Sequence, residues 1–254
     1  MEQALEVKDL CKTYVINKRQ NNVLKNISFS IQKGEMVAIM GPSGSGKSTL
    51  LYCVSSMDKP TAGKVVLYDK VMTDLSENEM SDLRLNEMGF IFQQMHMLKN
   101  LTIMDNILLP AYQSKNKSRS RAEINTYCRE LMRKLSISEI AGNDITEVSG
   151  GQLQRACICR SLINKPQIIF ADEPTGALNH SASQDVMQEL NKINEEGSTI
   201  MLVTHDRTVA SKCGRVIYIE DGAVKGELML GKNNKKDGKE RERKVNQWLS
   251  DMGW

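Results

Sequence analysis

A glycine-rich segment directly after an apolar run constrains the fold of this chain more than any other feature of its sequence. Met36-Val37-Ala38-Ile39-Met40 is a continuous apolar run, typical of a strand that is buried on both faces. The segment that follows, Gly41 to Thr49, fits the pattern G-x-x-x-x-G-K-[ST], and a helix is expected from about Lys47 to Ser56. A strand, a glycine-rich loop and a helix in this order predict a phosphate-binding loop in an α/β protein.

The residue types in this loop suit the phosphates of a nucleotide bound with Mg²⁺. Glycines let successive backbone N–H groups point at phosphate oxygens, and the start of a helix adds partial positive charge. Lys47 is expected to reach the β- and γ-phosphates, and the Ser48 hydroxyl to coordinate Mg²⁺. The residues predicted to contact the nucleotide here are Gly41, Ser43, Gly44, Ser45, Gly46, Lys47, Ser48 and Thr49.

A second apolar run, Ile168 to Ala171, ends in two carboxylates that complete the predicted site. Asp172 stands at the end of this expected strand, where a carboxylate beside a phosphate loop can hold Mg²⁺. Glu173 lies one residue beyond, where it can act as the general base that polarises an attacking water. An apolar run ending in Asp-Glu is weak evidence alone, and it becomes strong in combination with the loop at Gly41.

The segment Val148-Ser149-Gly150-Gly151-Gln152-Leu153-Gln154-Arg155 resembles the signature of the ATP-binding cassette (ABC) family, usually L-S-G-G-Q-x-Q-R. The resemblance extends from Leu5 to about Leu230. It implies a chain that binds ATP with Mg²⁺ and hydrolyses it. It also implies that Tyr14 stacks on adenine, that Gln93 contacts Mg²⁺ and water, and that His205 senses the γ-phosphate.

The same resemblance implies a head-to-tail pair of cassettes. In this arrangement Ser149, Gly150, Gly151 and Gln152 of one subunit would close over the phosphate loop of another. A helix is expected from Gly151 to Ile163, and a helix start is an anion-binding site. Because the chain carries one cassette, the second is expected from another copy or from a paralogue.

Two positions depart from the family pattern. Val148 replaces the usual leucine, which is a mild apolar exchange, and Asn179 stands where the family usually has aspartate. Loss of that carboxylate could alter communication between the two sites or slow hydrolysis. Since Glu173 and His205 are retained, an active ATPase is still expected.

The order of the expected elements predicts an α/β fold with a P-loop NTPase core and a parallel sheet, an N-terminal antiparallel β part, and an inserted helical subdomain. Leu5–Leu10 and Ile27–Ile31 are expected strands, joined by a hairpin loop at Asn17–Asn22. Helices expected at 103–112, 120–135 and 151–163 would form the insertion, at about residues 94–165. The ABC ATPase domain is predicted to cover residues 1–230.

Residues 231–254 are predicted to form a basic linker and a short amphipathic helix. Val245, Trp248, Leu249 and Met252 make one apolar stripe at helical spacing, for which packing on the protein's own surface is favoured over binding to a partner. Seven basic and three acidic residues between Gly231 and Asn246 give this segment a net charge of +4, so the remainder of the chain, which totals +3 with it, is at −1. Such a charge is too weak to argue for nucleic acid as a partner.

The segments Phe170–Leu178 and Cys213–Ile219 suggest what the ATPase powers. The first resembles the branch of macrolide exporters, lipoprotein-release ATPases and antimicrobial-peptide resistance transporters; the second most resembles the bacitracin- and lantibiotic-resistance type. The resemblance implies a peripheral subunit on the cytoplasmic face of the membrane that works with a separate permease. Its expected role is to export or detach antimicrobial peptides or related amphipathic compounds, with antibiotic resistance as the outcome.

Other functions are weighed against this interpretation. An ABC ATPase that acts as a regulatory or assembly subunit, rather than as a transport motor, stays open as the alternative. A GTPase or small-molecule kinase is disfavoured because of the signature, and because neither Asn164-Lys165 nor Asn191-Lys192 is followed by aspartate two residues on. No run approaches the roughly 18 apolar residues that a membrane-spanning helix needs, and no signal peptide is visible at the start.

Overall fold

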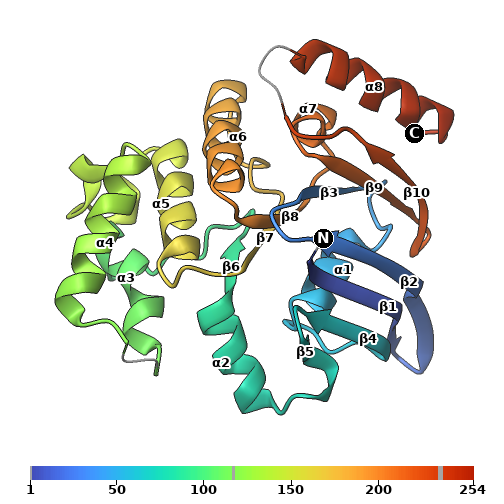
Figure 1. Cartoon of the computed structure of the whole chain (residues 1–254), viewed down its shortest axis with the longest axis horizontal. Coiled ribbons are helices and arrows are strands. Elements are labelled where there is room, and N and C mark those ends of the chain that lie inside the picture. The colour runs from blue at the N-terminus through green and yellow to red at the C-terminus, as the bar shows by residue number, and fades with distance from the viewer. Residues whose placement is uncertain (1, 116–117, 234–236) are drawn as a thin grey trace. The chain divides into compact units, whose positions relative to one another are not determined.

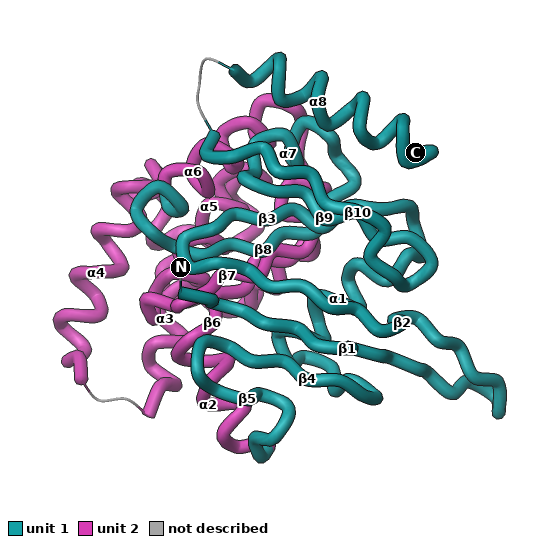
Figure 2. The backbone as a smooth tube through the Cα atoms, turned by 45° about the vertical axis from the view of Figure 1, so that its right-hand side comes forward, with its two compact units in different colours: residues 1–76, 193–254 teal, residues 77–192 magenta. Residues whose placement is uncertain are grey.

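The computed structural model describes residues 2–115, 118–233 and 237–254 (Figure 1). The chain forms two compact units (Figure 2). Unit 1 combines Met1–Ser76 with Ile193–Trp254, and unit 2 is Glu77–Lys192. The predicted helical subdomain, residues 94–165, falls within the limits of unit 2.

The N-terminal part of unit 1 forms an antiparallel sheet. Its strands lie in the order β2-β1-β4-β5, and they are β1 (Gln3–Ile16), β2 (Arg19–Gln32), β4 (Ala62–Leu67) and β5 (Lys70–Val71). The expected six-residue loop between the first two strands is wrong. The turn contains only Asn17 and Lys18, which have φ of 49° and 63°, while Ile16 pairs with Arg19. Asn adopts left-handed backbone readily, and the polar start of β2 is exposed, which explains why its composition resembles a loop.

The second sheet of unit 1 positions the predicted phosphate loop. β3 (Met36–Met40) lies between β8 (Thr199–Val203) and β9 (Arg215–Glu220) and is parallel to both, and β10 (Ala223–Met229) pairs antiparallel with β9. Every residue of β3 and β8 is buried, as their continuous apolar runs predict. The loop after β3 leads into α1 (Lys47–Val54), and a short helix that was not predicted, α7 (Arg207–Ser211), follows β8.

Unit 2 contains two parallel strands and most of the helices. β6 (Met88–Ile91) pairs with β7 (Ile168–Asp172). The helices are α2 (Glu77–Glu87), α3 (Ile103–Gln113), α4 (Arg121–Lys134), α5 (Gly150–Leu162) and α6 (His180–Glu195), the last of which runs into unit 1. The three helices expected in the insertion agree with α3, α4 and α5 to within one residue at each end, because side-chain caps mark where they begin. Thr102, Ser120 and Ser149 each accept a hydrogen bond from the backbone N–H three residues on.

The C-terminal segment returns to unit 1 as α8 (Gly238–Asp251), which lies beside α7 (Figure 1). The predicted apolar stripe lies on this helix. Val245 and Leu249 are fully buried, and the Trp248 ring packs edge-on against Tyr218 with centroids 6.2 Å apart. Residues 234–236 of the predicted basic linker lie outside the described part of the chain. Where the chain is described, no helix combines the length and the apolar character needed to cross a bilayer.

The packing of α8 on unit 1 can be tested with Leu249→Ala. Since Leu249 is fully buried, truncation should lower the free energy of unfolding by about 2–5 kcal/mol, measured by denaturant titration. Gln247→Ala, at an exposed position of the same helix, is the matched control and should change it by less than about 0.5 kcal/mol. Equal stabilities for the two variants would mean that α8 does not pack as described.

Candidate functional site

The predicted phosphate loop leaves β3 at its carboxyl end, and its glycines are required by the backbone. Gly41 has φ +152°, and a Cβ there would lie 1.9 Å from the Ile219 carbonyl oxygen. Gly44 and Gly46 have φ of 82° and 98°, in the left-handed region. Gly46 is the N-cap of α1 and has no side chain with which to close the first turn. The N–H groups at this helix start are therefore available to an oxyanion.

Two side chains in the loop fit a bound phosphate. Lys47 Nζ donates to the carbonyl oxygens of Gly41 and Pro42, each at 2.9 Å, so the ammonium lies against the loop itself. Ser45 Oγ is buried and has no hydrogen-bond partner among the described residues. A phosphate oxygen would supply an acceptor for the Ser45 hydroxyl and the Lys47 ammonium. Ser48 follows in the first turn of α1, where a hydroxyl can reach a metal ion held by the same phosphates.

The turn between β9 and β10 contacts the phosphate loop and supports it. The N–H of Gly222 donates to the Ser45 carbonyl at 3.2 Å, and the Gly222 carbonyl accepts from the N–H of Lys25 at 2.8 Å. Gly222 has φ +76°, and a Cβ there would lie 2.2 Å from the Val23 carbonyl oxygen. In the sequence, Asp221-Gly222 is typical of a turn and nothing more. Its contact with the loop joins segments far apart in the chain and leaves no local signal.

The side chain of Tyr14, predicted to stack on adenine, is held by two residues that were not predicted. Its hydroxyl donates to Asp58 Oδ2 at 2.5 Å. Lys12 Nζ donates to Asp58 Oδ1 at 2.6 Å and lies 4.7 Å from the centroid of the Tyr14 ring, within the range of a cation–π interaction. Burial and the Asp58 carboxylate raise the pKa of Tyr14 to about 12, so the hydroxyl remains a donor at neutral pH.

His205 lies at the same edge of the sheet as the phosphate loop. β3 and β8 are parallel, and Ile39 is paired with Val203, so Gly41 and His205 each follow two residues beyond this pair. The neighbours of His205 are fixed by local hydrogen bonds. The N–H of Asp206 donates to Thr204 Oγ1 at 3.0 Å, and Asp206 Oδ1 caps α7 by accepting from the N–H of Thr208 at 2.7 Å. The histidine itself is exposed.

The predicted residues of unit 2 gather at the ends of β6 and β7. Ile91 pairs with Ala171, so Gln93 and Glu173 follow at the same edge. A Cβ on Gly176 would lie 3.0 Å from Gln93 Nε2, which places the Gln93 amide beside the turn that begins at Glu173. Asp172 ends β7 and is buried. Glu173 has φ +46°, an uncommon conformation for a non-glycine residue that often occurs at functional sites.

The predicted signature begins α5 with a complete capping box. Ser149 Oγ accepts from the N–H of Gln152 at 3.2 Å, and Gln152 Oε1 accepts from the N–H of Ser149 at 2.9 Å. The N–H groups of Gly150 and Gly151 belong to the first turn, where no intrahelical carbonyl can accept from them. Ser149 and Gly150 are exposed, so this helix start can receive an anion from outside the chain.

Two contacts join this helix start to the turn after β7. The buried Gln154 side chain donates through Nε2 to the Pro174 carbonyl at 2.7 Å. A Cβ on Gly150 would lie 3.6 Å from Leu178 Cδ2, which is ordinary packing distance. The predicted signature and the predicted general base are therefore parts of one packed region of unit 2.

The departure at Asn179 has a structural account. Asn179 Oδ1 accepts from the N–H of Ala182 at 2.9 Å, and its carbonyl accepts from the N–H of Ser183 at 2.9 Å, which are the bonds of an N-cap for α6. Asn and Asp cap helices about equally well. The replacement therefore keeps the cap and removes only the negative charge.

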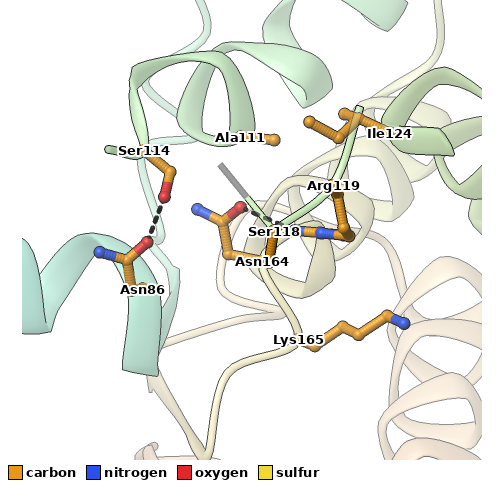
Figure 3. A pocket seen from close by; sticks show the side chains of 8 residues that line it. All are labelled: Asn86, Ala111, Ser114, Ser118, Arg119, Ile124, Asn164 and Lys165. Atoms are coloured by element: carbon orange, nitrogen blue, oxygen red, sulfur yellow. Dashed lines mark hydrogen bonds between the residues drawn. The ribbon is translucent and has the colours of Figure 1, made fainter. Parts of the chain in front are cut away.

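Unit 2 also contains a cavity of about 350 Å³ (Figure 3). None of the predicted site residues lines it. Ser114 Oγ donates to Asn86 Oδ1 at 2.5 Å, and Arg119 donates to the Ile163 carbonyl at 3.0 Å and to Asn164 Oδ1 at 3.3 Å. The first bond joins the ends of α2 and α3, and the two bonds of Arg119 join the end of α5 to the segment before α4.

Each unit thus carries one group of the predicted site residues. Unit 1 holds Tyr14, the phosphate loop and His205, and unit 2 holds Gln93, Asp172, Glu173 and the signature. Within unit 1 the structure places His205 at the same sheet edge as the phosphate loop, and within unit 2 it places Gln93 at the same edge as Glu173. That the two groups act on one nucleotide remains a prediction from the sequence.

Comparisons with known proteins find a matching family and similar relatives. The sequence profile of the ABC transporter family matches residues 24–176. The bacitracin export ATP-binding protein BceA of Halalkalibacterium halodurans is 42% identical over 228 residues, which cover 89% of this chain and 89% of BceA. The macrolide export ATP-binding/permease protein MacB of Mannheimia succiniciproducens is 41% identical over 221 residues, which cover 87% of this chain and 34% of MacB.

A solved structure is also similar along most of the chain. The ATP-binding cassette MJ0796 of Methanocaldococcus jannaschii, in a dimeric post-hydrolysis state bound to ADP and Pi, matches with a TM-score of 0.82 at 38% identity. The match covers 89% of this chain and 98% of that structure.

The support that Gly222 gives to the phosphate loop can be tested with Gly222→Ala. The substitution should destabilise the protein and weaken nucleotide binding, because the new Cβ would collide with the Val23 carbonyl and displace the bond to Ser45. Gly197→Ala is the matched control. Its φ is +104° but a Cβ there has open space, so only the backbone cost of about 1–2 kcal/mol is expected, with unchanged nucleotide affinity. Unfolding titrations and nucleotide-binding isotherms of both variants measure the difference, and identical behaviour would contradict the assigned support.

Proposed function

Because this chain belongs to the ABC transporter family, we propose that it is the ATP-hydrolysing subunit that powers a separate membrane permease. The chain is an ATPase of that family and uses ATP with Mg²⁺. The observation that carries the proposal is the pair of helix starts suited to phosphate in one chain, at Gly46 in unit 1 and at Ser149 in unit 2. The family resemblance implies that these two helix starts serve different ATP molecules.

We infer a head-to-tail pair of cassettes from this arrangement. The exposed Ser149-Gly150 end of α5 would approach the phosphates held by the loop of another cassette, and the same patches would be used twice. The dimeric state of the MJ0796 cassette supports this inference. The partner would be a second copy of this chain or a paralogous ATPase.

The residues divide the work of hydrolysis between them. Lys47 and the N–H groups of the loop would hold the β- and γ-phosphates, while Ser48 and Asp172 would hold Mg²⁺ with Gln93 beside it. Mg²⁺, when bound, neutralises charge on the phosphates. Glu173 would orient and polarise the attacking water, and His205 would contact the γ-phosphate. The Tyr14 ring, fixed by Asp58 and Lys12, would stack on the base.

The proposal places the subunit at the cytoplasmic face of the membrane, held there by its permease. The names of BceA and MacB connect these relatives with export, and MacB combines ATP-binding and permease parts in one protein. We infer an export function for this chain. Because BceA is named as a bacitracin export protein, antimicrobial peptides or related amphipathic compounds are the proposed cargo.

The segment from Gln94 to Tyr112 is the proposed contact with the permease. Leu98 is 46% exposed there, although it is a large apolar residue. Its backbone is nevertheless fixed, because buried Asn106 accepts from the N–H of Leu98 at 2.7 Å and donates to its carbonyl at 3.0 Å. A rigid loop that presents an apolar side chain suits a lasting protein contact.

Glu173→Gln tests the chemistry. The variant should still bind ATP and should lose hydrolysis by a factor of about 10² to 10⁴, because an amide cannot accept the proton of water. Size-exclusion chromatography with ATP should then show a stable dimer, whereas Lys47→Ala should bind little ATP and stay monomeric. Hydrolysis at the normal rate in Glu173→Gln would remove the general base from the proposal.

Leu98→Lys tests the transport role. Affinity purification of the tagged chain from detergent-solubilised membranes should recover a multispanning protein, and the substitution should reduce that recovery while the isolated subunit hydrolyses ATP normally. Met229→Lys, at another exposed apolar position, is the matched control. Recovery of a soluble scaffold in place of a multispanning protein would favour the assembly alternative.

A further inference from the structure

Arg241 on the C-terminal helix is buried, although it is charged. It is 3% exposed, and its guanidinium donates to five backbone carbonyls. The acceptors are Ser211 at 2.8 Å, Cys213 at 2.6 Å, Leu230 at 2.8 Å, Gly231 at 3.2 Å and Lys232 at 3.3 Å. A buried charge is costly unless its hydrogen bonds are satisfied, and here the whole guanidinium is engaged.

The acceptors show what Arg241 holds in place. Ser211 ends α7 and Cys213 follows shortly after it, so Arg241 binds carbonyls at the C-terminus of that helix, where unsatisfied acceptors carry partial negative charge. The other three carbonyls belong to the chain that leaves β10. Arg241 therefore ties α7 to the end of the sheet.

The rest of the C-terminal segment contacts the opposite end of α7. Arg207, its first residue, donates to Asn246 Oδ1 at 3.4 Å, and its guanidinium lies 5.4 Å from the Trp254 ring. Trp254 in turn packs against Tyr218 of β9, with ring centroids 5.8 Å apart. The helix α7 is thus contacted at both ends by residues 241–254.

His205 lies between β8, which ends two residues before it, and α7, which begins two residues after it. Asp206 is the N-cap of α7, so the histidine directly precedes the helix. A helix of five residues is not stable by itself, and α7 therefore depends on its packing for its place. α8 packs against it, as their adjacent ribbons in Figure 1 show, and β3 contacts it as well.

We propose that α8 positions His205 for ATP hydrolysis and that Arg241 is the positioning residue. The proposal rests on the γ-phosphate role given to His205 under the proposed function. It extends that function to residues 238–254, which lie outside the predicted catalytic domain of residues 1–230. Gly222 and Asp58, which hold the phosphate loop and the Tyr14 ring, lie outside this segment, so the affinity for ATP is expected to be retained.

The first test separates hydrolysis from binding. Arg241→Ala should lower kcat by about 10- to 100-fold, as expected for a misplaced catalytic group. KM for ATP, and the dissociation constant of ATP measured in the Glu173→Gln background, should stay within about twofold, less than the change expected for a lost direct contact. Arg243→Ala, at an exposed position two residues along the same helix, is the matched control and should retain wild-type kcat.

Two further variants guard against simple misfolding. Arg241→Lys keeps the charge and some of the donors, so it should recover part of the lost kcat. Trp254→Ala removes the ring contact with Arg207 at the other end of α7 and leaves the bonds of Arg241 to the five carbonyls in place. It should therefore lower kcat to a smaller extent. All variants are assayed well below their own unfolding temperatures, so that only folded protein is compared.

A double-mutant cycle decides whether the effect passes through His205. If it does, Arg241→Ala should cost little further kcat once His205→Ala is present. Additive losses would overturn the proposal, as would a wild-type kcat in Arg241→Ala. A wild-type kcat in His205→Ala would instead remove the role of His205 itself, which is the part of the proposed function on which this inference rests.

Discussion

The close approach of the phosphate loop to the neighbouring strand is the constraint on which the site of unit 1 depends. Gly41 follows β3 and lies so near the carbonyl of Ile219 that no side chain fits between them. The loop can therefore turn sharply from a buried strand into α1, which leaves the first N–H groups of that helix facing outward. Gly222 closes the same contact from the next turn by binding the carbonyl of Ser45. A nucleotide site made of backbone groups needs this rigidity, because its donors have no rotamers with which to adjust.

Parallel strands explain why the chemistry gathers where it does. β3 and β8 are in register, and so are β6 and β7. Residues two positions beyond each pair, such as Gly41 and His205 or Gln93 and Glu173, consequently share an edge although they are far apart in the sequence. Ligands of open α/β sheets bind outside the carboxyl ends of the strands, which is where Gly41, His205, Gln93 and Glu173 lie.

Residues with no proposed role in nucleotide binding or hydrolysis hold the predicted site residues in place. Asp58 and Lys12 fix the Tyr14 ring, and Gln154 ties the signature helix to the turn after Glu173. Arg241 holds the helix that follows His205. Asp58 accepts from the Tyr14 hydroxyl and from Lys12, whereas Gln154 and Arg241 donate to backbone carbonyls within their own units. Pre-organisation of this kind lowers the cost of aligning the reacting groups.

The sequence by itself determined the strand–loop–helix around Gly41, the helices α3, α4 and α5 to within one residue at each end, and the family of the chain. It could do so because those features are local: an apolar run, positions that need glycine, and cap residues three positions from their partners. It misjudged the hairpin at Asn17, because an exposed strand and a loop share one composition. Only the tertiary structure decided which residues support the site. Asp58 lies 44 residues from Tyr14 and Arg241 lies 30 residues from Ser211. Contacts over such separations follow from how the strands and helices pack, and no periodicity or spacing along the chain records them.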